Sequence, residues 1–103
     1  MNIQEKLFTE IGQKMKDSQH CQMFGKPCFK IKGKAFICFF NDCMVFKLAG
    51  SIHNEALKMS GAILFDPSGK KHPMKEWVQL PFSGKGRWEE FANAAYDYVA
   101  GAI

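Results

Sequence analysis

The chain has 103 residues, of which 47% are hydrophobic and 23% are charged, and its formal net charge is +4 at pH 7. A chain of this length holds one hydrophobic core and not two, and this composition excludes an intrinsically disordered protein. A charge of +4 is too small to indicate nucleic-acid binding by itself. We therefore expect a single domain over residues 1–103.

We expect neither a membrane-spanning segment nor a signal peptide in this sequence. No apolar run reaches the roughly 20 residues that a membrane span needs, and the first residues lack the basic and then apolar pattern of a signal peptide. The four Cys and six Met fit a reducing compartment, and so apolar a chain needs no disulfide framework. We expect a cytoplasmic protein with no membrane contact.

Apolar residues recur at three- and four-residue steps from Ile3 to Met15, which predicts an amphipathic helix over residues 2–19. Gly12 weakens this helix without ending it. The chain must turn between Phe24 and Pro27, and the period then changes from helical to alternating. We expect a sheet to begin at residue 28, with three strands in quick succession.

Two turns fix the predicted register of these strands. A three-residue loop at 32–34, with its Gly in the left-handed conformation, places Phe29 opposite Ile37 and Ile31 opposite Ala35. A two-residue turn at 41–42 predicts the pairs Phe40–Cys43, Phe39–Met44, Ile37–Phe46 and Ala35–Leu48. Both turns give the same core face: Phe29, Ile31, Ala35, Ile37, Phe39, Met44, Phe46 and Leu48.

The second half of the chain predicts two more strands between two helices. Ser51 is the expected N-cap of a short helix that ends near Met59. Strands follow at 62–65 and 75–80, joined by the loop 66–73. A last helix starts near residue 85 and buries these side chains: Trp88, Phe91, Ala92, Ala95 and Val99.

The resulting order, α-β-β-β-α-β-β-α, predicts an α+β fold. The chain lacks the βαβαβ alternation of strands and helices that a parallel sheet requires. A two-layer sandwich, with an antiparallel five-stranded sheet and helices on one face, is the natural arrangement of these elements.

The segment 63–81 carries the strongest family signal. Its Leu64-Phe65-Asp66-Pro67 and Pro73-Met74-Lys75-Glu76-Trp77-Val78 motifs, with Met23-Phe24-Gly25 and Gly33-Lys34-Ala35-Phe36, resemble the N-terminal domain of the TfoX/Sxy competence regulators. The order of elements is similar along nearly the whole chain. The resemblance implies a short, single-domain member without the helical C-terminal domain of the full-length regulators. It implies a non-enzymatic regulatory or protein-interaction module. The identity of its protein partner is unknown, and the resemblance points to a component of transcription.

The side of the sheet away from the core is the predicted interaction face, and it consists of Cys28, Phe36, Cys38, Phe40, Cys43 and Val45. Exposed apolar side chains of this kind mark an association surface, so we expect a homodimer through this face. The register also places Cys28 directly opposite Cys38, with Cys43 diagonal to the latter.

Three interpretations of these thiols stay open: small apolar filling of the face, a redox switch, and an adventitious metal site. The chain has no CxxC motif, and no His lies at ligand spacing to the thiols. We therefore predict no structural metal and no cofactor.

A basic cluster suggests an alternative function, weak binding of DNA or RNA. Its predicted contacts are Lys70, Lys71, Lys75, Trp77, Lys85 and Arg87. The competing interpretation is a solvated hairpin loop.

The sequence favours no catalytic activity. Asp66, His72 and Glu76 could meet around one loop, but a loop His near carboxylates is more often a surface hydrogen-bonding group than a general base. We expect no enzyme.

Overall fold

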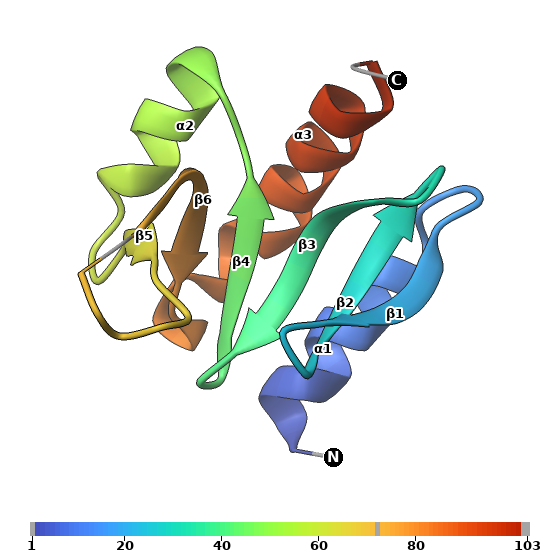
Figure 1. Ribbon diagram of the computed structural model, residues 1–103, viewed down its shortest axis with the longest axis horizontal. Coiled ribbons are helices and arrows are strands. Elements are labelled where there is room, and N and C mark those ends of the chain that lie inside the picture. Colours follow the sequence, from blue (N-terminus) through green and yellow to red (C-terminus); the bar gives the residue numbers. More distant parts are fainter. Residues whose placement is uncertain (1, 72, 102–103) are drawn as a thin grey trace.

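A twisted antiparallel sheet with helices packed behind it forms the molecule (Figure 1). The computed structural model describes residues 2–71 and 73–101. Within them, six strands lie in the order β1-β2-β3-β4-β6-β5. Their bounds are β1 (Gln19–Met23), β2 (Lys26–Ile31), β3 (Lys34–Phe40), β4 (Cys43–Lys47), β5 (Ile63–Phe65) and β6 (Met74–Leu80). The α+β class and the antiparallel sheet are confirmed, and the predicted strand number of five is wrong.

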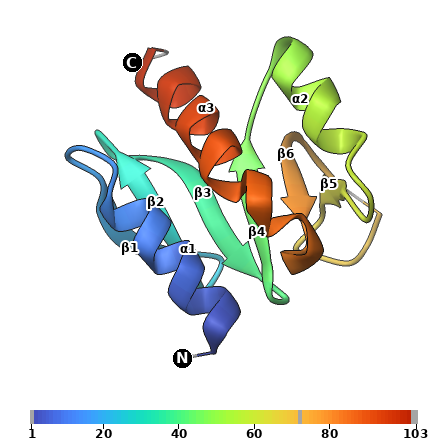
Figure 2. The same ribbon diagram turned by 180° about the vertical axis from the view of Figure 1, so that it is seen from behind.

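The helices are α1 (Ile3–Gln13), α2 (Gly50–Leu57) and α3 (Trp88–Gly101), with the 3-10 helix η1 (Phe82–Arg87) leading into α3. Seen from behind, α1 and α3 cross the rear face of the sheet, and α2 lies beside β6 (Figure 2). All three contribute to one core. Seven of the predicted core residues of the sheet are buried in it: Phe29, Ile31, Ile37, Phe39, Met44, Phe46 and Leu48.

The last helix agrees closely with the prediction. Its buried residues are Trp88, Phe91, Ala92, Ala95 and Val99. The regular helix begins at Trp88 and not near residue 85, because the preceding residues form η1. In the middle of the chain, α2 begins at Gly50 with Ala49 as its N-cap residue, so Ser51 lies inside the helix and the predicted N-cap is wrong.

The N-terminal helix is shorter than predicted, and β1 follows it. Helix α1 ends at Gln13, and the Ser18 hydroxyl donates a hydrogen bond to the Gly12 carbonyl at 2.7 Å. The turn Phe24-Gly25 has φ values of 54° and 74°, which is the backbone conformation of a tight hairpin. Residues 19–23 thereby pair with β2 as the outermost strand on this side of the sheet.

A β-bulge in the β2–β3 hairpin changes which side chains face the core. The turn is the two-residue Lys32-Gly33, with φ values of 52° and 82°, and it pairs Lys30 with Ala35. The register shifts between Phe29 and Lys30, so that Phe29 still pairs with Ile37 as predicted. The extra residue on β3 therefore places Phe36 in the main core, while Ala35 packs on the opposite side of the sheet. The predicted pair Ile31–Ala35 is wrong, because Ile31 pairs with Lys34.

The β3–β4 hairpin has the predicted two-residue turn, with φ values of 51° at Asn41 and 59° at Asp42. The pairs Phe40–Cys43, Phe39–Met44 and Ile37–Phe46 are confirmed. The predicted pair Ala35–Leu48 is wrong. Leu48 lies beyond the end of β4, and its N–H donates to the Glu76 carbonyl at 2.8 Å.

Candidate interaction face

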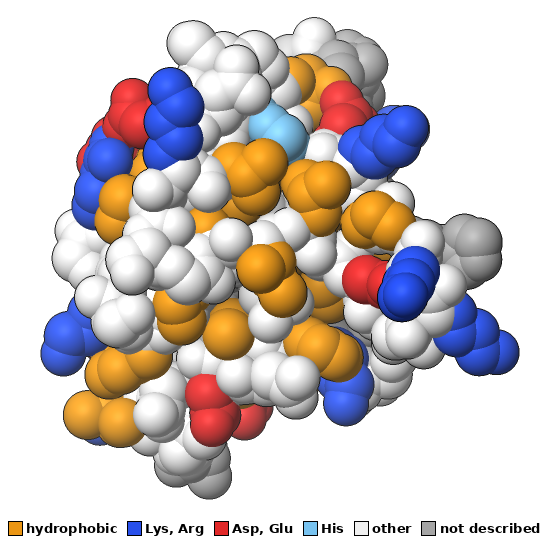
Figure 3. Space-filling model, turned by 90° about the vertical axis from the view of Figure 1, so that its left-hand side faces the viewer, with side chains coloured by type: hydrophobic (Ala, Val, Ile, Leu, Met, Phe, Trp, Pro, Cys, Tyr) orange, Lys and Arg blue, Asp and Glu red, His pale blue; other side chains and the backbone are white. Residues whose placement is uncertain are grey.

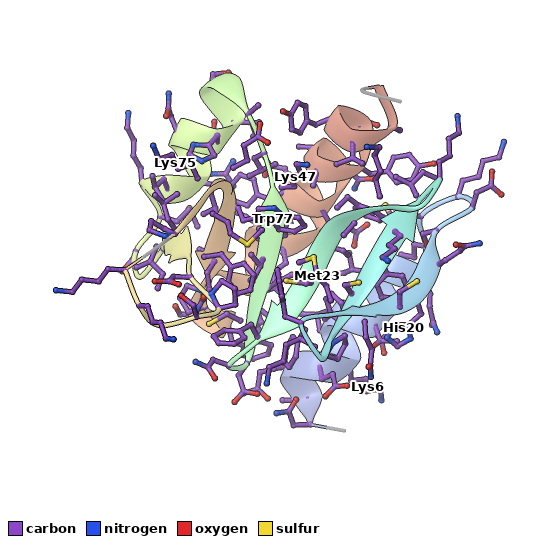
Figure 4. All side chains as sticks on the ribbon, viewed as in Figure 1. Lys6, His20, Met23, Lys47, Lys75 and Trp77 are labelled. Carbon is purple, nitrogen blue, oxygen red and sulfur yellow. The ribbon has the colours of Figure 1, made fainter. Side chains whose placement is uncertain are left out.

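The outer face, defined here as the side of the sheet turned away from α1 and α3, carries a second hydrophobic cluster. Its buried members are Cys28, Cys38, Val45, Phe65 and Trp77, and its partly buried members are Cys21, Met23, Ala35, Phe40 and Met74. Among the described elements, no helix lies over the front of β1 to β4 in Figure 1. Figure 4 shows Met23 and Trp77 on this front side. The described helices thus leave the outer face uncovered.

The structure confirms the predicted side of the sheet for Cys28, Cys38 and Val45 and corrects it for Phe36. Cys28, Cys38 and Val45 lie on the outer face, but they are fully buried within the single chain. Phe36 lies in the main core, where its ring meets the edge of Tyr96 at 5.4 Å between centroids. Phe36 is therefore not part of the outer face, because the bulge in β3 places its side chain on the helix side of the sheet.

Phe40 and Cys43 are the two predicted contact residues that keep accessible surface. The Phe40 ring meets Phe65 edge-on with 5.3 Å between the centroids, and the Lys26 Nζ lies 5.5 Å from the Phe40 centroid. Met23 and Met74 are partly exposed in the same cluster. Sequence reasoning missed Met23 because the prediction gave its segment no strand, although the Phe24-Gly25 turn signal was present.

The charge on this side of the sheet is positive. Strands β1 to β4 contain neither Asp nor Glu, and three of their four Lys lie on the outer face, whereas Lys34 pairs with the core residue Ile31. Lys26 pairs with Met23, Lys30 with Ala35 and Lys47 with Trp77, and each partner belongs to the outer cluster. Cross-strand partners share a face, so these lysines frame the apolar cluster. Figure 4 shows Lys47 beside Trp77.

A smaller apolar area lies at the β5 edge of the sheet. Ile63 on this edge strand is 55% exposed. Seen from the side of α2 and β5, hydrophobic side chains gather near the centre of the surface, with charged side chains of both signs around them (Figure 3). This mixture of signs distinguishes the edge from the outer face.

The thiols lie where the register predicted, with one addition. Cys28 pairs with Cys38, as expected, and Cys21 on β1 pairs with Cys28. Burial raises the pKa of Cys28, Cys38 and Cys43, and it outweighs the opposing effect of Lys30 on Cys28 and of the Gln79 hydrogen bond on Cys43. Among the described residues, no group of three or more His, Cys, Asp or Glu side chains is arranged to hold a metal ion.

The residues of the predicted basic cluster lie on different elements, and the charge of one of them, Arg87, is paired with carboxylates. The Arg87 guanidinium donates hydrogen bonds to Glu55 and Glu90 and lies 4.6 Å from the centroid of the Phe91 ring. Its hydrogen bonds to Glu90 and Glu55 raise its pKa. Two carboxylates thus balance this charge. Arg87 ties η1 to α2 and α3 and is a poor phosphate ligand.

The other members of the cluster are dispersed. Lys85 Nζ lies 4.7 Å from the centroid of the Phe82 ring and lines a hollow with residues of α1. Lys70, Lys71 and Lys75 are exposed on the β5–β6 connection and the start of β6. Trp77 is only 6% exposed and packs against Phe65, so little of its ring is available to stack on a base.

The three residues considered for catalysis do not form a described site. Asp66 accepts hydrogen bonds from the Ser68 hydroxyl and from the Gly69 N–H, which stabilise the loop. Glu76 accepts a hydrogen bond from the Tyr98 hydroxyl, and this bond raises the Tyr98 pKa. His72 lies outside the described residues. Asp66 and Glu76 are therefore both engaged in hydrogen bonds within the fold.

Comparisons of the chain with protein-family models, with curated proteins and with solved structures gave no match. Within the described residues, none of the helices has the length and apolar character to cross a membrane.

Proposed function

We propose that this chain is a non-enzymatic interaction module whose outer face binds an acidic segment of a partner protein. The observation that carries this proposal is an apolar cluster framed by Lys26, Lys30 and Lys47, on the side of the sheet that the described helices leave uncovered.

The apolar part of the contact comes from three partly exposed side chains, Met23, Phe40 and Met74. They rest on a fully buried layer that includes Cys38 and Val45. Methionine side chains adapt to differently shaped apolar partners. A rigid layer beneath them limits the conformational entropy that they lose on binding. An apolar side chain of a partner would bury its surface here.

The charges favour an acidic partner over a second copy of the chain. A two-fold contact through the outer face would bring Lys26, Lys30 and Lys47 of one copy toward the same lysines of the other. Like charges at an interface oppose association, whereas carboxylates on a partner attract it and speed the encounter. We therefore place a homodimer through this face second.

The aromatic side chains favour a protein over a nucleic acid. Single-stranded nucleic acids are held by bases stacked on free aromatic rings beside a positive groove. Trp77 is almost fully buried, and the Phe40 ring already contacts Phe65 and lies under Lys26. Weak nucleic-acid binding through the exposed lysines of the β5–β6 connection stays the alternative function.

The likeness to the N-terminal domain of TfoX/Sxy regulators supports a regulatory role for such a module. A regulator of this kind acts by holding a partner and needs no chemistry of its own. The partner that we propose is accordingly a transcription component with an acidic surface.

Charge reversal on the outer face tests the proposal. Tagged protein would be used to capture partners from its native cell lysate, with and without nuclease treatment, and three baits would be compared by quantitative mass spectrometry. The baits are the unchanged chain, the Lys26→Glu/Lys47→Glu variant and a control, Lys6→Glu/Lys58→Glu, whose residues are exposed on helix α1 and at the end of α2.

We expect proteins with acidic segments to be retained by the unchanged chain and by the control, and to fall about tenfold or more with the outer-face variant. Equal retention by all three baits would overturn the proposed binding face. Retention that disappears with nuclease would favour nucleic-acid binding instead. Light scattering of the purified chain would reveal a homodimer. A dimer that is lost in the outer-face variant but not in the control would mean that a second copy of the chain binds the outer face.

A further inference from the structure

Three cysteines form a continuous cross-strand row on the outer face. Cys21 on β1 pairs with Cys28 on β2, which pairs with Cys38 on β3. All three belong to the same hydrophobic cluster, so their thiols lie on one side of the sheet. The four cysteines of the chain are reduced in this structure.

The backbone geometry of such a row is compatible with a disulfide at either step. Directly opposite residues of antiparallel strands have Cα atoms about 4.5 or about 5.5 Å apart, depending on the position in the ladder. Disulfides join residues whose Cα atoms are about 4.4–6.8 Å apart. Cys28 can therefore bond to either neighbour without a change of strand register.

Exposure falls along the row from the edge of the sheet inward. Cys21 lies on the edge strand β1 and is partly exposed. Cys28 and Cys38 are fully buried. An oxidant arriving from solvent therefore meets Cys21 first, and burial, which raises the pKa of the other two thiols, slows direct attack on them.

We propose that this row is an oxidation site in which a hydroperoxide reacts at Cys21 and the oxidation ends as a Cys28–Cys38 disulfide. In the first step the Cys21 thiolate attacks the peroxide, takes one oxygen as a sulfenic acid and, with one proton taken up, releases an alcohol, or water from hydrogen peroxide. The Cys28 thiol then attacks the Cys21 sulfur, which forms the Cys21–Cys28 disulfide and releases water.

The last step is a thiol–disulfide exchange within the row. The Cys38 thiol, on giving up its proton, attacks the Cys28 sulfur, and the Cys21 thiolate leaves and takes up a proton. Cys21 is the better leaving group because it is the more exposed thiol, and the disulfide that remains is buried and protected from reductants. One hydroperoxide is reduced and two thiols are oxidised, so the electrons balance.

Intact-mass and peptide-mapping experiments on the folded chain test this sequence. The protein would be treated with a few equivalents of hydrogen peroxide, quenched with an alkylating reagent and digested. Single variants Cys21→Ser, Cys38→Ala and Cys43→Ser would be treated in parallel. Cys43 is the matched control, because it is a partly exposed thiol at a neighbouring position of the same sheet that lies outside the row.

We expect a loss of two hydrogens that a dithiol reverses, a mapped Cys28–Cys38 bond, and unchanged behaviour of Cys43→Ser. Cys21→Ser should slow disulfide formation at least tenfold, and Cys38→Ala should stop at a Cys21–Cys28 bond. Four results would overturn the proposal: no intramolecular disulfide, a final Cys21–Cys28 bond in the unchanged chain, an equal rate in Cys21→Ser, or a dependence on Cys43. Circular dichroism of each variant before treatment checks that it is folded.

Discussion

Gly12 of α1 lies directly against the ring of Phe29 on β2, and a Cβ at residue 12 would be 2.2 Å from Phe29 Cε2. The ring cannot withdraw freely, because it also packs against Phe8 with 5.3 Å between centroids. The close approach of α1 to the sheet thus depends on the missing side chain of Gly12.

We predict that Gly12→Ala destabilises the fold by about 1–3 kcal/mol. An alanine would add about 1 kcal/mol of helix propensity, but the overpacking against Phe29 outweighs this gain. Urea unfolding at neutral pH measures the change. Gly86→Ala is the matched control, since its Cβ would meet nothing within 4 Å, and it should change stability by less than about 0.5 kcal/mol. A Gly12→Ala variant as stable as the unchanged chain would contradict this packing.

The bulge in β3 predicts unequal effects at two phenylalanines of the same strand. Phe36→Ala should cost about 3–5 kcal/mol, because Phe36 is fully buried in the main core. Phe40→Ala should cost clearly less, because Phe40 retains exposed surface on the outer face. Denaturant unfolding measures the free energy of unfolding of the two variants. Equal costs, or a larger cost at Phe40, would restore the bulge-free register in which Phe36 faces outward.

The buried thiols predict a loss of stability at alkaline pH. Burial raises the pKa of Cys38 above its ordinary value of 9.0, so the unfolded chain loses this proton at a lower pH than the folded chain. The stabilising contribution of the neutral thiol is complete below pH 9 and declines as the pH rises above it. Between pH 9 and 10, Cys38 alone should lower the free energy of unfolding by about 1 kcal/mol.

Urea unfolding at pH 7, 8, 9 and 10 in the presence of a reductant measures this decline. The Cys38→Ala variant serves as the comparison, because lysine and tyrosine titration affects both proteins alike. Its free energy of unfolding should fall less between pH 9 and 10 than that of the unchanged chain. Parallel curves for the two proteins would mean that Cys38 ionises as easily in the folded state as in the unfolded one.

Arg87 should hold α2 in place, because its guanidinium bonds to Glu55 on α2 and to Glu90 on α3. We predict that Arg87→Gln speeds hydrogen exchange at the amides of α2. Lys85→Gln, on the same 3-10 helix but bonded to neither carboxylate in the described structure, should leave that exchange unchanged. Mass-spectrometric exchange over seconds to minutes compares them. If hydrogen exchange in α2 became faster in both variants or in neither, the bonds of Arg87 would not be what holds α2 in place.

Local signals in the sequence were sufficient for several elements. The helical spacing of Trp88, Phe91, Ala92, Ala95 and Val99 gave the buried side of α3, because a helix buries the same stripe whatever it packs against. The Asn41-Asp42 turn gave the register of β3 and β4, because two residues that tolerate positive φ allow only a tight hairpin. Cys28 was placed opposite Cys38 from a three-residue loop at 32–34, and this pair is present because the bulge compensates for the shorter turn that the structure has.

Tertiary structure decided the features that depend on distant partners. Residues 19–23 are mostly polar, and they form β1 because the edge of β2 supplies hydrogen-bonding groups to pair with. The Lys32-Gly33 turn could close with two or three residues, and the bulge that accompanies the shorter turn moves Phe36 into the core. Cys28 and Cys38 are buried in a cluster to which the distant strands β5 and β6 contribute Phe65 and Trp77. Sequence alone therefore placed Cys28, Cys38, Phe40 and Val45 on the outer face. The bulge exchanged Phe36 for Ala35 on that face, and packing between remote strands determined which of its side chains a partner can reach.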